Sequence, residues 1–148
     1  MEITKELNTV QKLSRQGFSF MEIMIVIILM AGIAAIAVPA FFGKLEEANI
    51  KTANIQMKSL ASALDFYHLD NHVYPSTEQG LEALRAKPEV GVIPKSWKGP
   101  YLNTELPKDP WNMDYVYRSN GSGFDIISLG ADGEEGGDEA NADITLSK

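Results

Sequence analysis

The chain has no cysteine among its 148 residues. Disulfide bonds, thiol catalysis and cysteine-ligated zinc are therefore excluded. Positive charge is also scarce, because 13 Lys and Arg residues face 20 Asp and Glu residues, which gives a formal net charge of -7. Binding to nucleic acid needs a basic surface, so we expect no nucleic-acid partner.

Residue arrangements that would support catalysis are missing as well. The sequence has no recognisable Ser-His-Asp set, metal-binding triad, opposed carboxylate pair or phosphate-binding loop. Outside the apolar run near the N-terminus only about a hundred residues remain, enough for one small core but not for a large pocket with its supports. We therefore expect that the protein is not an enzyme, and a membrane-anchored enzyme is the function that the sequence favours least.

What the sequence does have is a long apolar run. Residues 23–42 are uncharged over 20 positions, which is long enough to cross a bilayer as a helix. The segment before the run is polar and carries Lys5, Lys12 and Arg15. Basic residues on this side favour a cytoplasmic N-terminus, with the rest of the chain crossing outward.

The position of a cleavage site decides whether this run is discarded or kept. A secretory signal peptide would be cut after its apolar region, and residues 31–40 contain small residues suited to such a cut. The run is longer than a usual signal region, however, and continues into a helical pattern beyond Ala40. A cut between Gly17 and Phe18 fits better and would leave the apolar helix at the N-terminus of the mature protein.

Glu22 is the single charged residue between Phe18 and Phe42. An ionisable group inside a membrane segment is costly unless it is paired, so it indicates a function. If Phe18 becomes the mature N-terminus, its amine lies four residues away, and Glu22 of one subunit could pair with the amine of the next. The alternative is an acid at the membrane edge that is solvated by lipid headgroups.

Residues 17–22 read Gly-Phe-Ser-Phe-Met-Glu and lead into the apolar run. This segment resembles the class III leader of type IV pilins and of type II secretion pseudopilins, whose usual pattern is Gly-Phe-Thr-Leu-x-Glu. The third and fourth positions depart mildly from that pattern. The resemblance implies cleavage after Gly17 by a prepilin peptidase, N-methylation of Phe18 and a role for Glu22 in subunit assembly.

Beyond the apolar run the pattern becomes amphipathic. Pro39 is expected to kink or locally break the helix. After Gly43, apolar residues recur at steps of three and four, the spacing of one helix face: Ile50, Ala53, Met57, Leu60, Leu64 and Tyr67. We predict one long helix from Phe18 to about Leu69, with its second half packed against the rest of the chain.

The remaining residues predict short elements joined by long loops. Ser76 or Thr77 is expected to cap a short helix that reaches about Ala86. Residues 115–118 and 124–129 predict two strands with a glycine-containing turn between them. So few strands need the long helix to cover their apolar face. The predicted fold class is α+β, with a long N-terminal α-helix packed on a small antiparallel β-sheet head with long loops.

Three further segments carry a second resemblance. Residues 74–81, 107–111 and 128–133 read Tyr-Pro-Ser-Thr-Glu-Gln-Gly-Leu, Pro-Lys-Asp-Pro-Trp and Ser-Leu-Gly-Ala-Asp-Gly. In this order they resemble the major pseudopilin family of type II secretion, known as general secretion pathway protein G. Residues 112–114 depart from it, with Asn-Met-Asp where the family commonly has Gly-Asn-Pro. Asparagine tolerates the left-handed conformation of a glycine, so we expect Asn112 to preserve the turn.

Residues 129–143 mix glycines with oxygen-bearing side chains. Calcium takes six to eight oxygen ligands from carboxylates, amides and backbone carbonyls, in flexible geometry. Asp132 and Asp143 could bring two loop segments together around such an ion, although the spacing of an EF-hand is absent. From the residues alone, a flexible and solvated acidic loop is the simpler interpretation.

The resemblance favours calcium, because major pseudopilins carry a calcium ion in this loop. Matching positions imply ligation by the side chains of Asp132, Asn141 and Asp143, together with backbone oxygen near Leu129. The remaining acids of the loop are then expected to be solvated: Glu134, Glu135, Asp138 and Glu139.

The resemblance implies a structural function. The chain would be the major subunit of the type II secretion pseudopilus, a homopolymer that grows in the periplasm and drives folded proteins across the outer membrane. Its segments would be a cleaved leader at 1–17, an apolar transmembrane and assembly half-helix at 18–42, and a periplasmic head at 43–148. Implied partners are minor pseudopilins, the inner-membrane assembly platform, prepilin peptidase and, before assembly, the inner membrane. The alternative is a type IV pilin of a surface adhesion or motility pilus, which often carries a C-terminal cysteine pair that this chain lacks.

Overall fold

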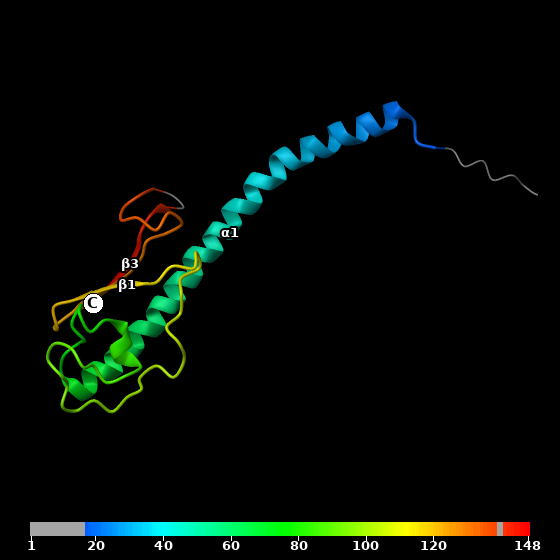
Figure 1. The fold of residues 1–148 in the computed structure, drawn as a ribbon. Helices are drawn as coiled ribbons and strands as arrows, with labels where there is room; N and C mark the ends of the chain where they lie inside the picture. Colours follow the sequence, from blue (N-terminus) through cyan, green and yellow to red (C-terminus); the bar gives the residue numbers. More distant parts are fainter. Residues whose placement is uncertain (1–16, 139–140) are drawn as a thin grey trace, which may run out of the picture. The chain divides into compact units, whose positions relative to one another are not determined.

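The computed structural model describes residues 17–138 and 141–148 (Figure 1). Of the predicted leader, residues 1–16 lie outside the described residues. The predicted α+β class is confirmed, because one long helix and a short 3-10 helix precede a small sheet. The elements in chain order are α1 (Phe20–Asn71), η1 (Leu81–Leu84), β1 (Val116–Ser119), β2 (Phe124–Ser128) and β3 (Ile144–Ser147).

The chain divides into two compact units, Met1–Ala40 and Phe41–Lys148. In the first unit every described residue is exposed, including large apolar side chains such as Leu29 and Ile36. Within the described residues, α1 is the helix that is long and apolar enough to cross a membrane. A contiguous apolar surface of this kind marks contact with a membrane or with other protein.

The helix α1 begins and ends within two residues of the predicted bounds. It passes through Pro39 without interruption, so of the two outcomes predicted there, a kink or a local break, the break does not occur. Proline removes one backbone donor, but the turns on either side keep their own hydrogen bonds and the helix continues.

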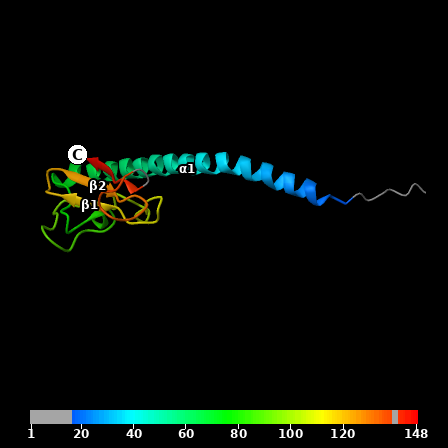
Figure 2. The ribbon, with the colours of Figure 1, turned by 90° about the horizontal axis from the view of Figure 1, so that it is seen from above.

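The core of the second unit is built on the predicted stripe of α1. The stripe is buried except for Ile50, which is 37% exposed. Its later residues, from Met57 to Tyr67, form one hydrophobic cluster with the sheet through Tyr117, Phe124 and Ile126. Both ribbon views place the strands beside this part of α1 (Figure 1, Figure 2). Burying a side chain of leucine size contributes about 1.5–3 kcal/mol, so this cluster holds the second unit together.

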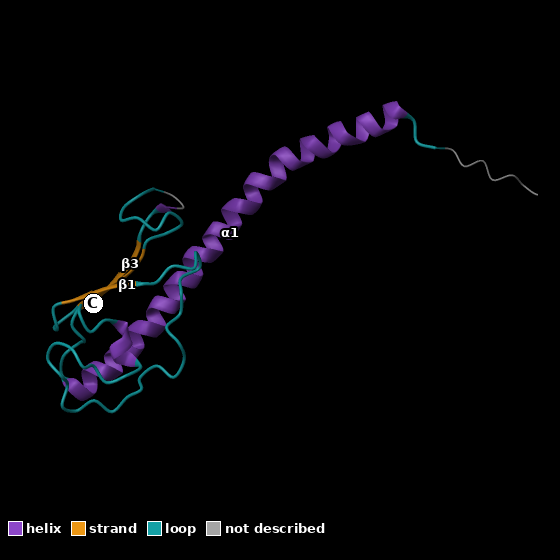
Figure 3. Ribbon diagram, in the orientation of Figure 1, coloured by secondary structure: helices purple, strands orange, loops and turns teal. Residues whose placement is uncertain are grey.

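The sheet has the order β1-β2-β3, with both pairs antiparallel. The first two strands confirm the prediction to within one residue at each end. The third strand was not predicted; it pairs Leu146 with Ile126, and Ile126 in turn pairs with Tyr117. Long loops connect these short strands to the helices (Figure 3).

The prediction for residues 76–86 is partly wrong. The short helix is the 3-10 helix η1, and its cap position is Gly80, which makes no side-chain capping bond. Gly80 has φ 61°, a conformation that favours glycine and separates the preceding turn from the helix. Ser76 instead closes that turn, because its amide donates to the Gln79 side chain at 3.0 Å.

Candidate functional site

The predicted cleavage site lies in irregular backbone before α1. Gly17, Phe18 and Ser19 are exposed and precede the first helical residue. The amide of Ile23 donates to the Ser19 carbonyl at 3.1 Å, which starts the helical hydrogen bonding. A peptide bond between Gly17 and Phe18 is therefore exposed and free of regular structure, as a protease requires.

Glu22 lies in the first turn of α1 and is exposed. A carboxylate at this end of a helix interacts favourably with the unpaired backbone amides and the helix dipole. Glu22 forms no ion pair with another described residue. Its charge is thus available to a partner outside the described chain.

The loop between β2 and β3 contains glycines whose backbone lies in the left-handed region. Gly137 has φ 85°, and a β-carbon there would lie 2.5 Å from the Asn141 carbonyl oxygen. Only glycine permits this close approach of the two limbs of the loop, the one that follows β2 and the one that leads into β3. The limbs are joined again where the Gly136 amide donates to Asp143 Oδ2 at 3.1 Å.

The predicted calcium ligands lie on both limbs of the loop and differ in how exposed they are. Asp132 Oδ1 accepts a bond from the Glu134 amide at 3.1 Å, a local turn within one limb. Asp143 lies on the other limb just before β3, while Asn141 is exposed and Leu129 is half-buried. Within residues 17–138 and 141–148, no three His, Cys, Asp or Glu side chains form a metal-binding cluster.

One atom in this loop supports a bound cation. Asp143 Oδ1 is buried and has no hydrogen-bond partner among residues 17–138 and 141–148. A buried acceptor without a partner costs about 1–3 kcal/mol, and a cation would remove that cost. Calcium does not need three carboxylates, because amide and backbone oxygens complete its shell. The donor chemistry of Asp132, Asn141 and Asp143 therefore fits a calcium ion.

The acids expected to be solvated are exposed where the structure describes them. Glu134 and Asp138 are exposed, and Glu139 lies outside the described residues. Glu135 is also exposed but forms an ion pair with Arg118 of β1. This contact links the loop to the sheet, and sequence reasoning missed it because the two residues are 17 positions apart.

Asp109 is a buried acid that was not recognised as important from the sequence. Its Oδ1 accepts bonds from the amides of Trp111 at 3.1 Å and Met113 at 2.8 Å. Its Oδ2 accepts a bond from the Ser128 hydroxyl at 2.6 Å. Asn112 lies in this turn between Trp111 and Met113 and has φ 69°, which confirms that asparagine adopts the left-handed turn conformation expected there. Asp109 thus fixes this turn to the end of β2.

The first part of α1 is apolar and exposed, and its second part forms the core of a small α+β unit. This architecture is that of a pilin-like protein. The sequence model of the family described as "Type II secretion system (T2SS), protein G" matches residues 40–147. The chain therefore belongs to the type II secretion system protein G family.

Relatives and a solved structure agree with this assignment. The chain is 45% identical over 137 residues to a type II secretion system core protein G of Pseudomonas aeruginosa, which covers 90% of this chain and 96% of the relative. It is 44% identical over 138 residues to the protein of that name in Vibrio cholerae, covering 90% and 93%. The crystal structure of the major pseudopilin of enterohaemorrhagic Escherichia coli matches with a TM-score of 0.62 and 38% identity, covering 70% of this chain and 90% of that chain.

Proposed function

We propose that the protein is the major structural subunit of a type II secretion pseudopilus, and that it has no enzymatic activity of its own. The observation that carries this proposal is the continuous helix α1, whose first part exposes apolar side chains and whose second part forms the core of the head. Many such helices can bundle into a filament and bury the apolar surface that a single chain leaves exposed. Growth of the filament in the periplasm would then push folded proteins through an outer-membrane channel.

The same helix supports an inner-membrane location before assembly. Residues 18–42 would span the bilayer, with the head on the periplasmic side. Copies of this chain, minor pseudopilins and the assembly platform of the inner membrane would be the partners, and prepilin peptidase would remove the leader after Gly17. The amine released on Phe18, which would be methylated, would pair with Glu22 of the neighbouring subunit and fix the register of the filament.

Replacing Glu22 with alanine tests this pairing. We expect Glu22→Ala to remove filaments from cells that overproduce the chain, because the terminal amine would lose its partner, while the head stays folded. Glu22→Asp keeps the charge on a shorter side chain and should retain part of the assembly. Electron microscopy counts the filaments, and mass spectrometry establishes whether the mature chain starts at methylated Phe18. Undiminished secretion by Glu22→Ala would contradict the proposal.

We further propose that the loop between β2 and β3 holds a structural calcium ion. Asp132, Asn141 and Asp143 would supply side-chain oxygens, and the backbone near Leu129 a carbonyl. The ion would neutralise the clustered carboxylates and hold the two limbs together. The buried Asp143 Oδ1, which has no hydrogen-bond partner among the described residues, supports this proposal.

Chelation tests the calcium proposal without reference to secretion. We expect excess chelator to lower the melting temperature of the protein, since the carboxylates would then repel one another, and added calcium to restore it. Asp143→Ala should melt at the lower temperature with or without chelator. An unchanged melting curve in excess chelator would exclude a structural ion.

A further inference from the structure

The outer face of α1, opposite the buried stripe, is exposed in the described part of the second unit. Lys51 and Lys58 lie seven residues apart on this face, which is two helical turns. Both side chains are exposed, and neither forms an ion pair with a described residue. Ile55 lies between them on the same face and is 60% exposed. The face is therefore both basic and partly apolar.

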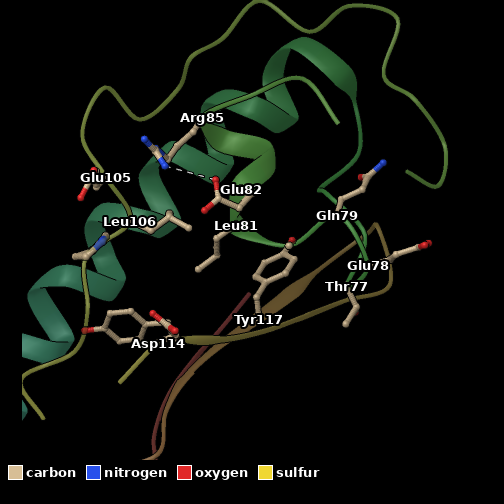
Figure 4. Close-up of a pocket in the computed structure, with 13 residues that line it drawn as sticks. Thr77, Glu78, Gln79, Leu81, Glu82, Arg85, Glu105, Leu106, Asp114 and Tyr117 are labelled. Carbon is tan, nitrogen blue, oxygen red and sulfur yellow. Dashed lines mark ion pairs between the residues drawn. The ribbon is translucent and has the colours of Figure 1, made fainter. Parts of the chain in front are cut away.

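A groove of opposite charge lies elsewhere on the same unit (Figure 4). It has a volume of about 600 Å³ and borders η1 and the start of the sheet. Four acids and one base line it: Glu78, Glu82, Glu105, Asp114 and Arg85. Since Arg85 pairs with Glu82 at 3.6 Å and Asp114 pairs with Lys108 at 2.9 Å, the acids that form no ion pair among the described residues are Glu78 and Glu105.

The groove also offers an apolar surface. Leu81, Leu106 and Tyr117 line it between the acids, and Figure 4 shows the side chains of Leu81 and Leu106 directed toward one another. Lysine suits such a surface, because its methylene chain packs against apolar groups while its ammonium group reaches acids at the rim.

We propose that Lys51 and Lys58 of one copy of the chain dock into the acidic groove of the next copy in the filament. The inference rests on the proposed function, because a filament needs two different and complementary surfaces on each subunit. The basic face of α1 and the groove are such surfaces: they differ in position, are opposite in charge and each carry an apolar part. Charge complementarity of this kind fixes register and rejects misaligned contacts.

Charge reversal on the full-length chain tests this docking. The lysine-reversed variant carries Lys51→Glu and Lys58→Glu, the acid-reversed variant carries Glu78→Lys and Glu105→Lys, and the exchanged variant carries all four changes. A matched control with Lys87→Glu and Lys95→Glu changes the net charge as the lysine-reversed variant does, at exposed lysines that do not line the groove. Filament yield per cell is measured by electron microscopy after mechanical shearing.

We expect the lysine-reversed and acid-reversed variants each to lose about tenfold or more in filament yield, since like charges would face each other. The exchanged variant should regain most of the yield, and the control should keep it. Equal melting temperatures of the purified variants would show that the loss is not caused by misfolding.

Wild-type yield in both reversed variants, or no recovery in the exchanged variant, would overturn the docking while leaving the filament function intact. Absence of filaments from the wild-type chain itself would overturn both. Disulfide crosslinking gives a second measurement, and because the chain has no cysteine, only the introduced cysteines can crosslink. The variant with Lys58→Cys and Glu105→Cys should give crosslinked multimers, whereas the variant with Lys58→Cys and Ser122→Cys should not. Equal crosslinking by the two pairs would also overturn the docking.

Discussion

Asp109 shows how a single side chain organises a turn that has no regular structure. Its two carboxylate oxygens accept three hydrogen bonds, two from backbone amides of the turn and one from Ser128. The side chain is 5% exposed, so none of these donors can turn to water without rearrangement. The turn and β2 are therefore coupled through one residue.

Replacing Asp109 with alanine should lower the free energy of unfolding by about 3 kcal/mol, because buried donors would be left without an acceptor. Asp109→Asn keeps one acceptor oxygen and should cost about half as much. Urea unfolding of residues 41–148 measures both values. A cost below that of a surface substitution, about 0.5 kcal/mol, would show that water replaces the carboxylate.

Two tyrosines of the core should make the fold sensitive to alkali. Burial raises the pKa of Tyr115 and of Tyr117 to about 12, above the value of about 10 in an unfolded chain. Their contribution to stability is thus complete below about pH 10 and is lost as the pH rises toward 12.

The variant with Tyr115→Phe and Tyr117→Phe should lose less stability over this pH range than the wild type. At neutral pH it should be less stable by about 1–3 kcal/mol, since the Tyr117 hydroxyl donates to the Pro75 carbonyl and the Tyr115 hydroxyl to Gln56. Unfolding free energies measured across the alkaline range check both expectations. Parallel pH profiles for the two proteins would contradict them.

At the scale of the elements, β3 holds the end of the chain against both the sheet and the helix. Leu146 packs against the core cluster. Lys148, just beyond the strand, donates from its ammonium group to Asp65 of α1 at 2.6 Å. The hydrogen bond from Lys148 lowers the pKa of the Asp65 carboxyl, against the opposing effect of burial. The first contact is apolar packing and the second is an ion pair, so they should contribute differently to the free energy of unfolding.

We expect Leu146→Ala to cost about 2 kcal/mol and Lys148→Ala less than about 1 kcal/mol, because the ion pair is exposed. The pKa of Asp65 is lowered in the folded protein, so the ion pair stabilises the fold above about pH 4 and this contribution is lost as the pH falls. Unfolding measured at neutral and acidic pH tests the ranking. A larger cost for Lys148→Ala at neutral pH would reverse it.

The sequence predicted the elements that have strong local patterns. The stripe of α1 repeats over several turns, and the strands before and after residues 120–123 flank a clear turn signal. The strand β3 was missed although Ile-Thr-Leu-Ser alternates apolar and polar residues, because four residues after an acidic loop carry little signal. The hydrogen bond between Asp109 and Ser128 joins residues that are far apart in the sequence, so no local sequence pattern predicts it. The burial of Asp143 Oδ1 likewise depends on the folded loop and has no local sequence signal.

At the scale of the whole molecule, stability and assembly reside in different segments. The buried apolar residues, from Ala53 to Ile127, all fall within Phe41–Lys148. The described part of the first unit buries none. Folding of the head should therefore be independent of the apolar start of α1.

A fragment of residues 41–148 should melt within a few degrees of the full-length chain in mild detergent, because both contain the same core. Thermal circular dichroism measures this difference. A markedly lower melting temperature of the fragment would show that the first unit contributes to the fold of the head. Leu64→Ala, which opens a cavity in the core, should lower the melting temperature of both by a similar amount.

The backbone pairing of Lys148 also restricts where the protein can be labelled. The Lys148 amide and carbonyl both bond to the backbone of Phe124, at 2.9 Å each. An affinity tag or fluorescent protein inserted directly beside Lys148 would lie at this paired position, next to the Asp65 contact. The exposed turn at Asn120 and Ser122 is the better place for a small epitope, and imaging of filaments should rely on a label there.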